Sequence, residues 1–208
     1  GMSLFTNSSC GIFPTLSANY PIANYPLAAL CLDYKMTLGR FGIESSLYNG
    51  KGYNGWSKGK HPFTFNPRKD GVFSITEINY QTEYGKCFGG FSLHTNGDMP
   101  DVAGECKTRE REKKVSPKMT FAWWGYAERK LWSRVRQEVN LLVQYTRTSS
   151  GFSECRNYMG AGVTWIHAPG GQKRHEAGLF LSAAQFKSCN EVAGEVTYRY
   201  SFNRDTYI

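Results

Sequence analysis

The sequence predicts an all-β fold, an antiparallel meander β-barrel of about eight to ten strands, complete or partial. Apolar and polar side chains alternate with a period of two from Ala28 to Leu38, and again from Glu195 to Phe202. That period is typical of a strand with one apolar and one polar face. No run of about 18 apolar residues occurs, which excludes a transmembrane helix and leaves a β-barrel as the route into a membrane. Length indicates one domain over residues 1–208.

Nine segments are predicted to be strands, with turn residues or longer polar stretches between them. In chain order they are Leu27–Leu38, Arg40–Tyr48, Gly71–Tyr84, Lys86–Thr95, Lys118–Tyr126, Glu138–Arg147, Asn157–His167, His175–Gln185 and Gly194–Phe202. Thr6–Ser17, which Pro14 interrupts, is a candidate tenth strand.

Each half of the chain contains strands whose two faces differ clearly. In the first predicted strand the apolar residues Leu30, Leu32, Tyr34 and Met36 alternate with Cys31, Asp33 and Lys35. A turn at Gly39 follows. In the second predicted strand Phe41, Ile43 and Leu47 lie on one face, and Gly42, Glu44 and Tyr48 lie on the other. Gly85 marks the next short turn. The sixth places Val139, Leu141, Val143 and Tyr145 opposite Asn140, Leu142, Gln144 and Thr146. After the Pro169–Gly171 turn, the final strand alternates Val196, Tyr198 and Tyr200 with Glu195, Thr197 and Arg199.

Short and long connections alternate along the chain, as in outer-membrane barrels with short turns at one end and long loops at the other. The long ones are Asn49–Asp70, Asn96–Pro117 and Ala127–Gln137. Leu131, Val135 and Val139 are four residues apart, which also suits a short amphipathic helix, but the sequence favours strand ends flanking a loop.

Charge and cysteine content narrow the class of protein. The net charge is +8, yet the basic residues are scattered, and the densest run, Lys107–Lys114, includes two glutamates; nucleic-acid binding is therefore not expected. Six cysteines without a CxxC spacing do not indicate structural zinc. Sequential pairing would join Cys10–Cys31, Cys87–Cys106 and Cys155–Cys189, and free thiols are the alternative.

Five stretches, in this order, resemble the carbohydrate-selective porins of the OprB type. They are LFTNSSCGIFPTLSANYPIANYPLAALCL (Leu4–Leu32), GVFSITEINYQ (Gly71–Gln81), GGFSLHT (Gly89–Thr95), GLFLSAAQF (Gly178–Phe186) and GEVTYRYSF (Gly194–Phe202). The resemblance follows the family's C-terminal portion, so it implies a fragment of a larger barrel in the outer membrane of a Gram-negative bacterium. It further implies passive, sugar-selective diffusion through a lumen lined with charged and aromatic residues. The chain does not open with a signal-peptide pattern, since Ser3–Cys10 is polar.

Polar residues on the alternating strands are the candidate sugar-binding residues of this lumen. If the apolar faces point outward, the inward set includes Asp33, Lys35, Glu44, Asn140, Gln144, Glu195 and Arg199. Planar hydrogen-bonding groups and aromatic rings are the chemistry that binds sugars. The alternative is that these residues form the solvated face of a soluble sheet. Trp123, Trp124, Trp132 and Trp165 could form interfacial girdles, although the adjacent Trp123 and Trp124 must face opposite sides.

No enzymatic activity, cofactor or metal site is expected. The four histidines have no HExxH or GxSxG context, and Gly50-Lys51-Gly52 lacks the strand-to-helix setting of a phosphate loop. The expected partners are carbohydrate and membrane lipid. If the strands do not close on themselves, unpaired edges would favour a homo-oligomer. The rival hypotheses are a soluble, lipocalin-like barrel that binds a ligand in an apolar interior and a porin remnant without function.

Overall fold

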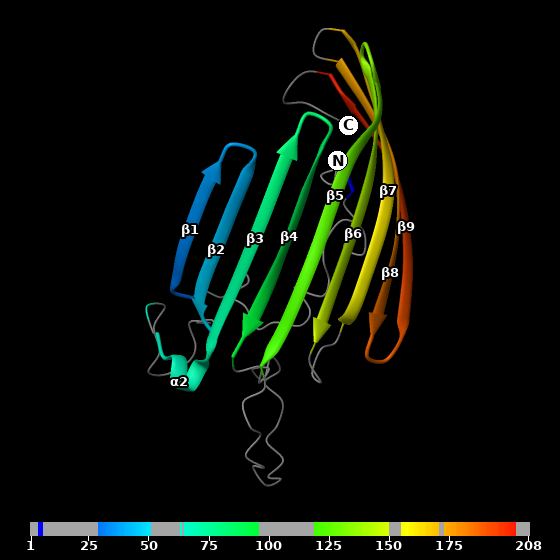
Figure 1. The fold of residues 1–208 in the computed structure, drawn as a ribbon. Coiled ribbons are helices and arrows are strands. Elements are labelled where there is room, and N and C mark those ends of the chain that lie inside the picture. Colours follow the sequence, from blue (N-terminus) through cyan, green and yellow to red (C-terminus); the bar gives the residue numbers. More distant parts are fainter. Residues whose placement is uncertain are drawn as a thin grey trace.

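The computed structural model describes residues 4–5, 29–50, 63, 65–95, 119–149, 155–170 and 173–202. This part of the chain forms one antiparallel sheet in which the strands follow one another in sequence order, β1 to β9 (Figure 1). The strands are β1 (Cys31–Leu38), β2 (Phe41–Asn49), β3 (Val72–Thr82), β4 (Gly85–His94), β5 (Thr120–Arg134), β6 (Gln137–Ser149), β7 (Cys155–Gly170), β8 (Lys173–Phe186) and β9 (Asn190–Ser201). The predicted all-β meander is confirmed.

All nine predicted strands are present, and the largest difference lies between β5 and β6. Ala127–Gln137 was expected to be a long loop, with a helix as the alternative, and both interpretations are wrong. Strand β5 instead continues to Arg134, because its register with β6 resumes after an irregularity between Lys130 and Trp132. The chain then reverses in a tight turn at Val135–Arg136, where Arg136 has a φ of 71°.

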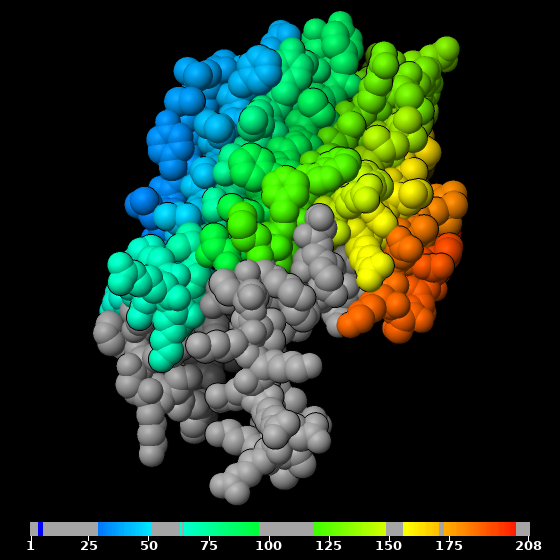
Figure 2. All heavy atoms as spheres, turned by 60° about the horizontal axis from the view of Figure 1, so that its bottom comes forward, coloured from blue at the N-terminus to red at the C-terminus, as the bar shows by residue number. Residues whose placement is uncertain are grey.

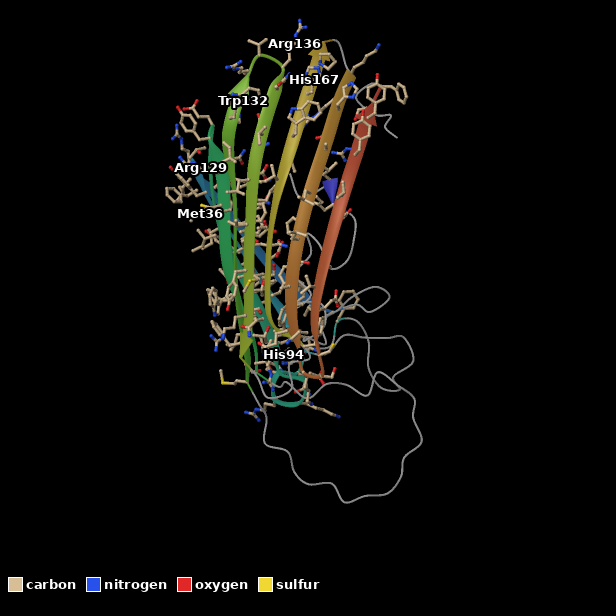
Figure 3. All side chains as sticks on the ribbon, turned by 90° about the vertical axis from the view of Figure 1, so that its right-hand side faces the viewer. Met36, His94, Arg129, Trp132, Arg136 and His167 are labelled. Atoms are coloured by element: carbon tan, nitrogen blue, oxygen red, sulfur yellow. The ribbon has the colours of Figure 1, made fainter. Side chains whose placement is uncertain are left out.

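The sheet is strongly curved but does not close on itself in the part of the chain described here. β1 and β9 are its two edges, and the curvature brings β6–β9 round behind β3–β5 (Figures 1 and 3). A space-filling view shows the same unbroken order of strands from blue to orange (Figure 2). The fold is therefore an open curved sheet, and the predicted barrel is not observed.

The connections lie in two groups at opposite ends of the sheet (Figure 1). We call these the turn end, with the turns after β1, β3, β5 and β7, and the loop end. At the loop end a short helix, α2 (Pro67–Asp70), precedes β3, and its buried Asp70 accepts a hydrogen bond of 3.1 Å from Asn49 Nδ2 at the end of β2. The predicted strand Thr6–Ser17 and the loop Asn96–Pro117 lie outside the described residues. None of the described helical residues forms a helix long and apolar enough to cross a membrane.

The tightest packing lies on the concave side of the sheet. Phe5, Tyr126, Leu142 and Phe180 form a buried apolar cluster, with Phe88 stacked on Tyr126 at 4.5 Å between ring centroids. Leu4 and Phe5 reach this cluster over Gly178, where an added Cβ would stand 2.8 Å from both side chains. Because Gly178 has no side chain, Leu4 and Phe5 can pack directly on the sheet at this position.

Cys31, Cys87 and Cys189 are free, exposed thiols. Each of the three sequential pairings includes one of them, so these pairings, which the sequence left open beside free thiols, are not formed. In the case of Cys87 the register explains the result, because its cross-strand neighbours are Tyr80 and Ala127. The alternative of free thiols holds for these three residues.

Candidate functional site

The two faces of the sheet differ in their side chains, with large exposed apolar groups on the convex face and ion pairs and buried residues on the concave face. Large apolar side chains point to the convex face, where Leu32 is 71% and Val196 83% exposed. The register continues this face across all nine strands, and Met36 and Arg129 project from it in Figure 3. The adjacent tryptophans divide as expected, since Trp123 is 43% exposed on this face and Trp124 is 4% exposed on the concave one.

The concave face holds the seven residues predicted to bind sugar. Cross-strand pairing places Asp33, Lys35, Glu44, Asn140, Gln144, Glu195 and Arg199 on this one face. They do not form one pocket. They fall into three groups, on β1–β2, on β6 and on β8–β9.

The first group lies at the β1 edge. Lys35 Nζ is 3.0 Å from Glu44 Oε2 in the next strand, and Ser46 donates a hydrogen bond to Asp33. Glu77 pairs with Glu44 in the register and is hydrogen-bonded by Trp124. Because Asp33 and Lys35 are exposed on an edge strand, this group is accessible to a ligand.

The second group lies on the central strands. Gln144 Nε2 donates to Tyr158 Oη at 2.5 Å, and Asn140 Nδ2 donates to Glu138 Oε1 at 2.8 Å. Glu138 also forms an ion pair with Lys130 at 3.1 Å. The two amides are buried, so they hold neighbouring side chains in place.

The third group lies on β8 and β9. Arg199 Nε donates to Glu176 Oε2 at 2.6 Å, and Arg174 Nη2 is 2.9 Å from the other oxygen of Glu176. Glu195 accepts a hydrogen bond of 2.9 Å from Thr197. Two guanidinium groups thus compensate one largely buried carboxylate, which offsets the cost of removing it from water.

Sequence reasoning missed several charged residues of the concave face. Glu128, which accepts from Tyr126 Oη at 2.7 Å and lies 3.5 Å from Lys86, belongs to this set, as do Glu138, Glu176 and Lys130. The same alternation would have found Glu138 and Glu176, whose strands were predicted. Glu128 and Lys130 were missed because they lie in the segment taken for a loop.

His94 has a structural role in the described part of the chain. It ends β4 at the loop end (Figure 3), is fully buried, and its Nε2 is 2.8 Å from the backbone oxygen of Gly50. Its ring also packs against Phe73. Among the described residues, no three His, Cys, Asp or Glu side chains are grouped to hold a metal ion.

Comparison with known proteins gives no relative from which a function could be taken. No protein-family model, no curated protein and no solved structure matches the chain.

Proposed function

We propose that this sheet is the wall of a membrane-spanning β-barrel of the outer-membrane porin type, and that the protein lets carbohydrates diffuse passively through it. The observation that carries this proposal is the distribution of side chains between the two faces. Exposed leucine, valine and aromatic residues cover the convex face, while the concave one carries the ion pairs and buried amides around the apolar cluster of Phe5, Tyr126, Leu142 and Phe180. Outer-membrane barrels have this arrangement, with lipid outside and a polar interior.

Aromatic rings near both ends of the convex face support a membrane-facing role. Towards the turn end Phe41 packs on Tyr80 with ring centroids 4.5 Å apart, and Trp132, Trp165 and Tyr200 lie in the same region. Towards the loop end Trp123 packs on Tyr145 at 5.1 Å. The convex positions between these two ends are largely aliphatic, and they include Ile43, Ile78, Val163, Leu179 and Val196. Two aromatic girdles flanking an apolar band are the pattern that the two membrane interfaces select.

Strand length and unpaired polar atoms agree with this arrangement. Strands β3 to β9 contain between 10 and 16 residues, and about 9–11 suffice for a tilted strand to cross a bilayer. The hydroxyls of Ser92, Thr146 and Thr164, all on the concave face, have no hydrogen-bond partner in the described part of the protein. Because all three are buried, each would cost about 1–3 kcal/mol if left dry, and an ordered water bound beside them would be consistent with a hydrated interior.

Closure of the barrel follows a parity rule. Odd-numbered strands of a meander run in the same direction, so the edges β1 and β9 are parallel to each other. Two copies inserted in the same orientation could therefore join these edges only as parallel strands, a less stable pairing. For an antiparallel barrel we propose an odd number of additional strands between β9 and β1. The homo-oligomer expected from the sequence would require parallel pairing between β9 of one copy and β1 of the next.

The carbohydrate part of the proposal rests on the resemblance to sugar-selective porins and on the concave side chains. Carboxylates, amides and guanidinium groups such as Glu44, Gln144 and Arg199 supply the planar hydrogen-bonding groups that recognise sugar hydroxyls. The exposed pair Lys35–Glu44 is the most accessible of them.

Reconstitution of the full chain into liposomes tests the proposal. We expect the protein to need detergent for purification and proteoliposomes to swell in iso-osmotic glucose faster than protein-free liposomes. Replacing Glu44 with glutamine should change the swelling rate for glucose, whereas Ile78→Val, on the convex face of the adjacent strand, should not. A chain that stays monomeric in plain buffer, and leaves liposomes impermeable, would instead identify the soluble ligand-binding alternative.

A further inference from the structure

Two adjoining hollows lie on β6–β9 towards the loop end. One has a volume of about 320 Å³ and the other of about 510 Å³, and both are lined by Met159, Ala183 and Val192. We call the pair the β7–β9 groove. The concave groups that the proposed function uses lie on the opposite face of the sheet.

The register divides the convex side of this groove into three rows. At the loop end Arg147, Asn157, Gln185 and Asn190 pair in one row across four strands. The next convex row is Tyr145, Met159, Ala183 and Val192, and the third is Val143, Ala161, Leu181 and Gly194. Polarity therefore changes within one row, from charged and amide groups to apolar ones.

The two apolar rows leave room for an acyl chain. The small residues Ala161, Ala183 and Gly194 alternate with Met159, Leu181 and Val192, which are exposed. Small side chains among large exposed ones leave a short furrow over Ala161 and Ala183, bounded by Met159, Leu181 and Val192, and this furrow is the smaller hollow. An apolar chain laid there would cover side chains that otherwise face the surroundings, Val192 being 79% exposed.

The polar row offers donors to an anion. Asn157 Nδ2 donates to Gln185 Oε1 at 2.6 Å, and Asn157 Oδ1 accepts from Tyr145 Oη at 3.3 Å. Because the Gln185 Oε1 atom accepts this hydrogen bond, the side-chain NH₂ group of Gln185 is left as a donor. Arg147 is exposed, and no carboxylate in the described segments forms an ion pair with it. The Arg147 guanidinium and the Gln185 amide lie in one row, with Asn157 of β7 between them, and both carry N–H donors of the kind that bind a phosphate group.

We propose that the β7–β9 groove binds one anionic phospholipid, with its phosphate at Arg147 and Gln185 and an acyl chain along Met159, Ala183 and Leu181. This inference rests on the proposed function, because it requires the convex face to meet lipid. It adds a defined lipid site with a charge preference, which a uniform apolar surface would not have.

Tryptophan quenching by brominated lipids tests the site in the full chain. Trp123 pairs with Arg147 in the register and packs on Tyr145, so it reports on the headgroup end of the groove. Trp132 and Trp165, exposed on the same face at the turn end, are replaced with phenylalanine in every protein tested so that their quenching does not mask this signal. In mixed micelles we expect brominated phosphatidylglycerol to quench the fluorescence at about fivefold lower mole fraction than brominated phosphatidylcholine, the ratio expected for one arginine near a membrane surface.

Variants separate this site from general surface charge. Arg147→Gln should abolish the preference and Arg147→Lys should retain most of it. Arg134→Gln, on the same face but at the turn end beside Trp132, should leave it unchanged. Ala183→Leu fills the furrow and should weaken quenching by both lipids.

Three results would overturn the inference. They are an unchanged preference in Arg147→Gln, an equal loss in Arg134→Gln, or the lack of any preference in the wild type. If neither brominated lipid quenches the wild-type protein, the lipid-facing role of the whole convex face is wrong, and the proposed function is overturned with it.

Discussion

Replacing Leu179 with arginine gives the most direct measure of what the convex face meets. Leu179 lies near the middle of β8, between Val163 of β7 and Val196 of β9, and is 49% exposed. If this face contacts hydrocarbon, the substitution costs about 2–4 kcal/mol, which is roughly a 30- to 900-fold change in the folding equilibrium constant. If it contacts water, an exposed substitution changes stability by about 0.5 kcal/mol or less.

The assay is urea-dependent refolding of the full chain into phosphatidylcholine vesicles, followed by tryptophan fluorescence. Leu38→Arg is the matched control, because Leu38 is 64% exposed on the same face but ends β1 beside the turn. There we expect a cost of only about 0–1 kcal/mol, since the penalty falls towards the interface. Equal costs at the two positions would refute the assignment of this face to the bilayer.

Three further substitutions test the concave face and a turn. Glu176→Gln removes the carboxylate between two arginines and should lower the free energy of unfolding by about 1.5–3 kcal/mol, measured by urea titration. Gly178→Val should displace Phe5 and make the N-terminal segment more sensitive to limited proteolysis. Gly125→Ala is the control and should not change this sensitivity, because a Cβ added there meets no atom within 4 Å. Equal sensitivity of the two variants would mean that packing at Gly178 does not hold the segment on the sheet. Arg136→Gly should raise the midpoint of unfolding, because the left-handed conformation costs a residue with a Cβ about 1–2 kcal/mol; a lower midpoint would contradict this.

The strand pattern was readable from the sequence because alternation is a local property. Leu32, Val163 and Val196 each mark an apolar face with their immediate neighbours, and turn glycines such as Gly39 separate one strand from the next. A short turn fixes the register only within the hairpin that it closes, as at Gly39 between β1 and β2. The positions of all nine strands could therefore be predicted without any long-range information.

The length of β5 was not readable, because its end depends on a partner strand. Leu131, Val135 and Val139 have helical spacing, but β6 supplies a continuous hydrogen-bonding edge, and the irregularity at Lys130–Trp132 absorbs the extra residue. Pairing across a hairpin thus overrode a weak helical period. Whether the sheet closes into a barrel could not be predicted for a similar reason, because no local sequence pattern determines the number of strands in a sheet.

The seven candidate residues were placed on one face by alternation, but their grouping needed the register. Arg199 and Glu176 are 23 positions apart in the chain and meet because β8 and β9 pair directly. The apolar cluster around Phe180 was not foreseen either, because it includes Phe5 from a segment remote from every strand. A polar concave face deduced from strand periodicity alone therefore omits the aromatic rings that pack on it.

The distribution of ion pairs between the faces gives a physical reason to treat Arg147 separately. Glu44, Glu128, Glu138 and Glu176 each pair with a lysine or arginine on a neighbouring strand or their own, and all of them lie on the concave face. Cross-strand compensation of this kind lets a sheet carry many charges on one side without repulsion. Arg147 lies on the other side, in a row with Asn157, Gln185 and Asn190. Glu191 lines the same hollow, but no carboxylate of the described strands forms an ion pair with Arg147. An external anion held next to an apolar furrow is the compensation that a bilayer can provide, which is why an anionic lipid suits this position better than a neutral one.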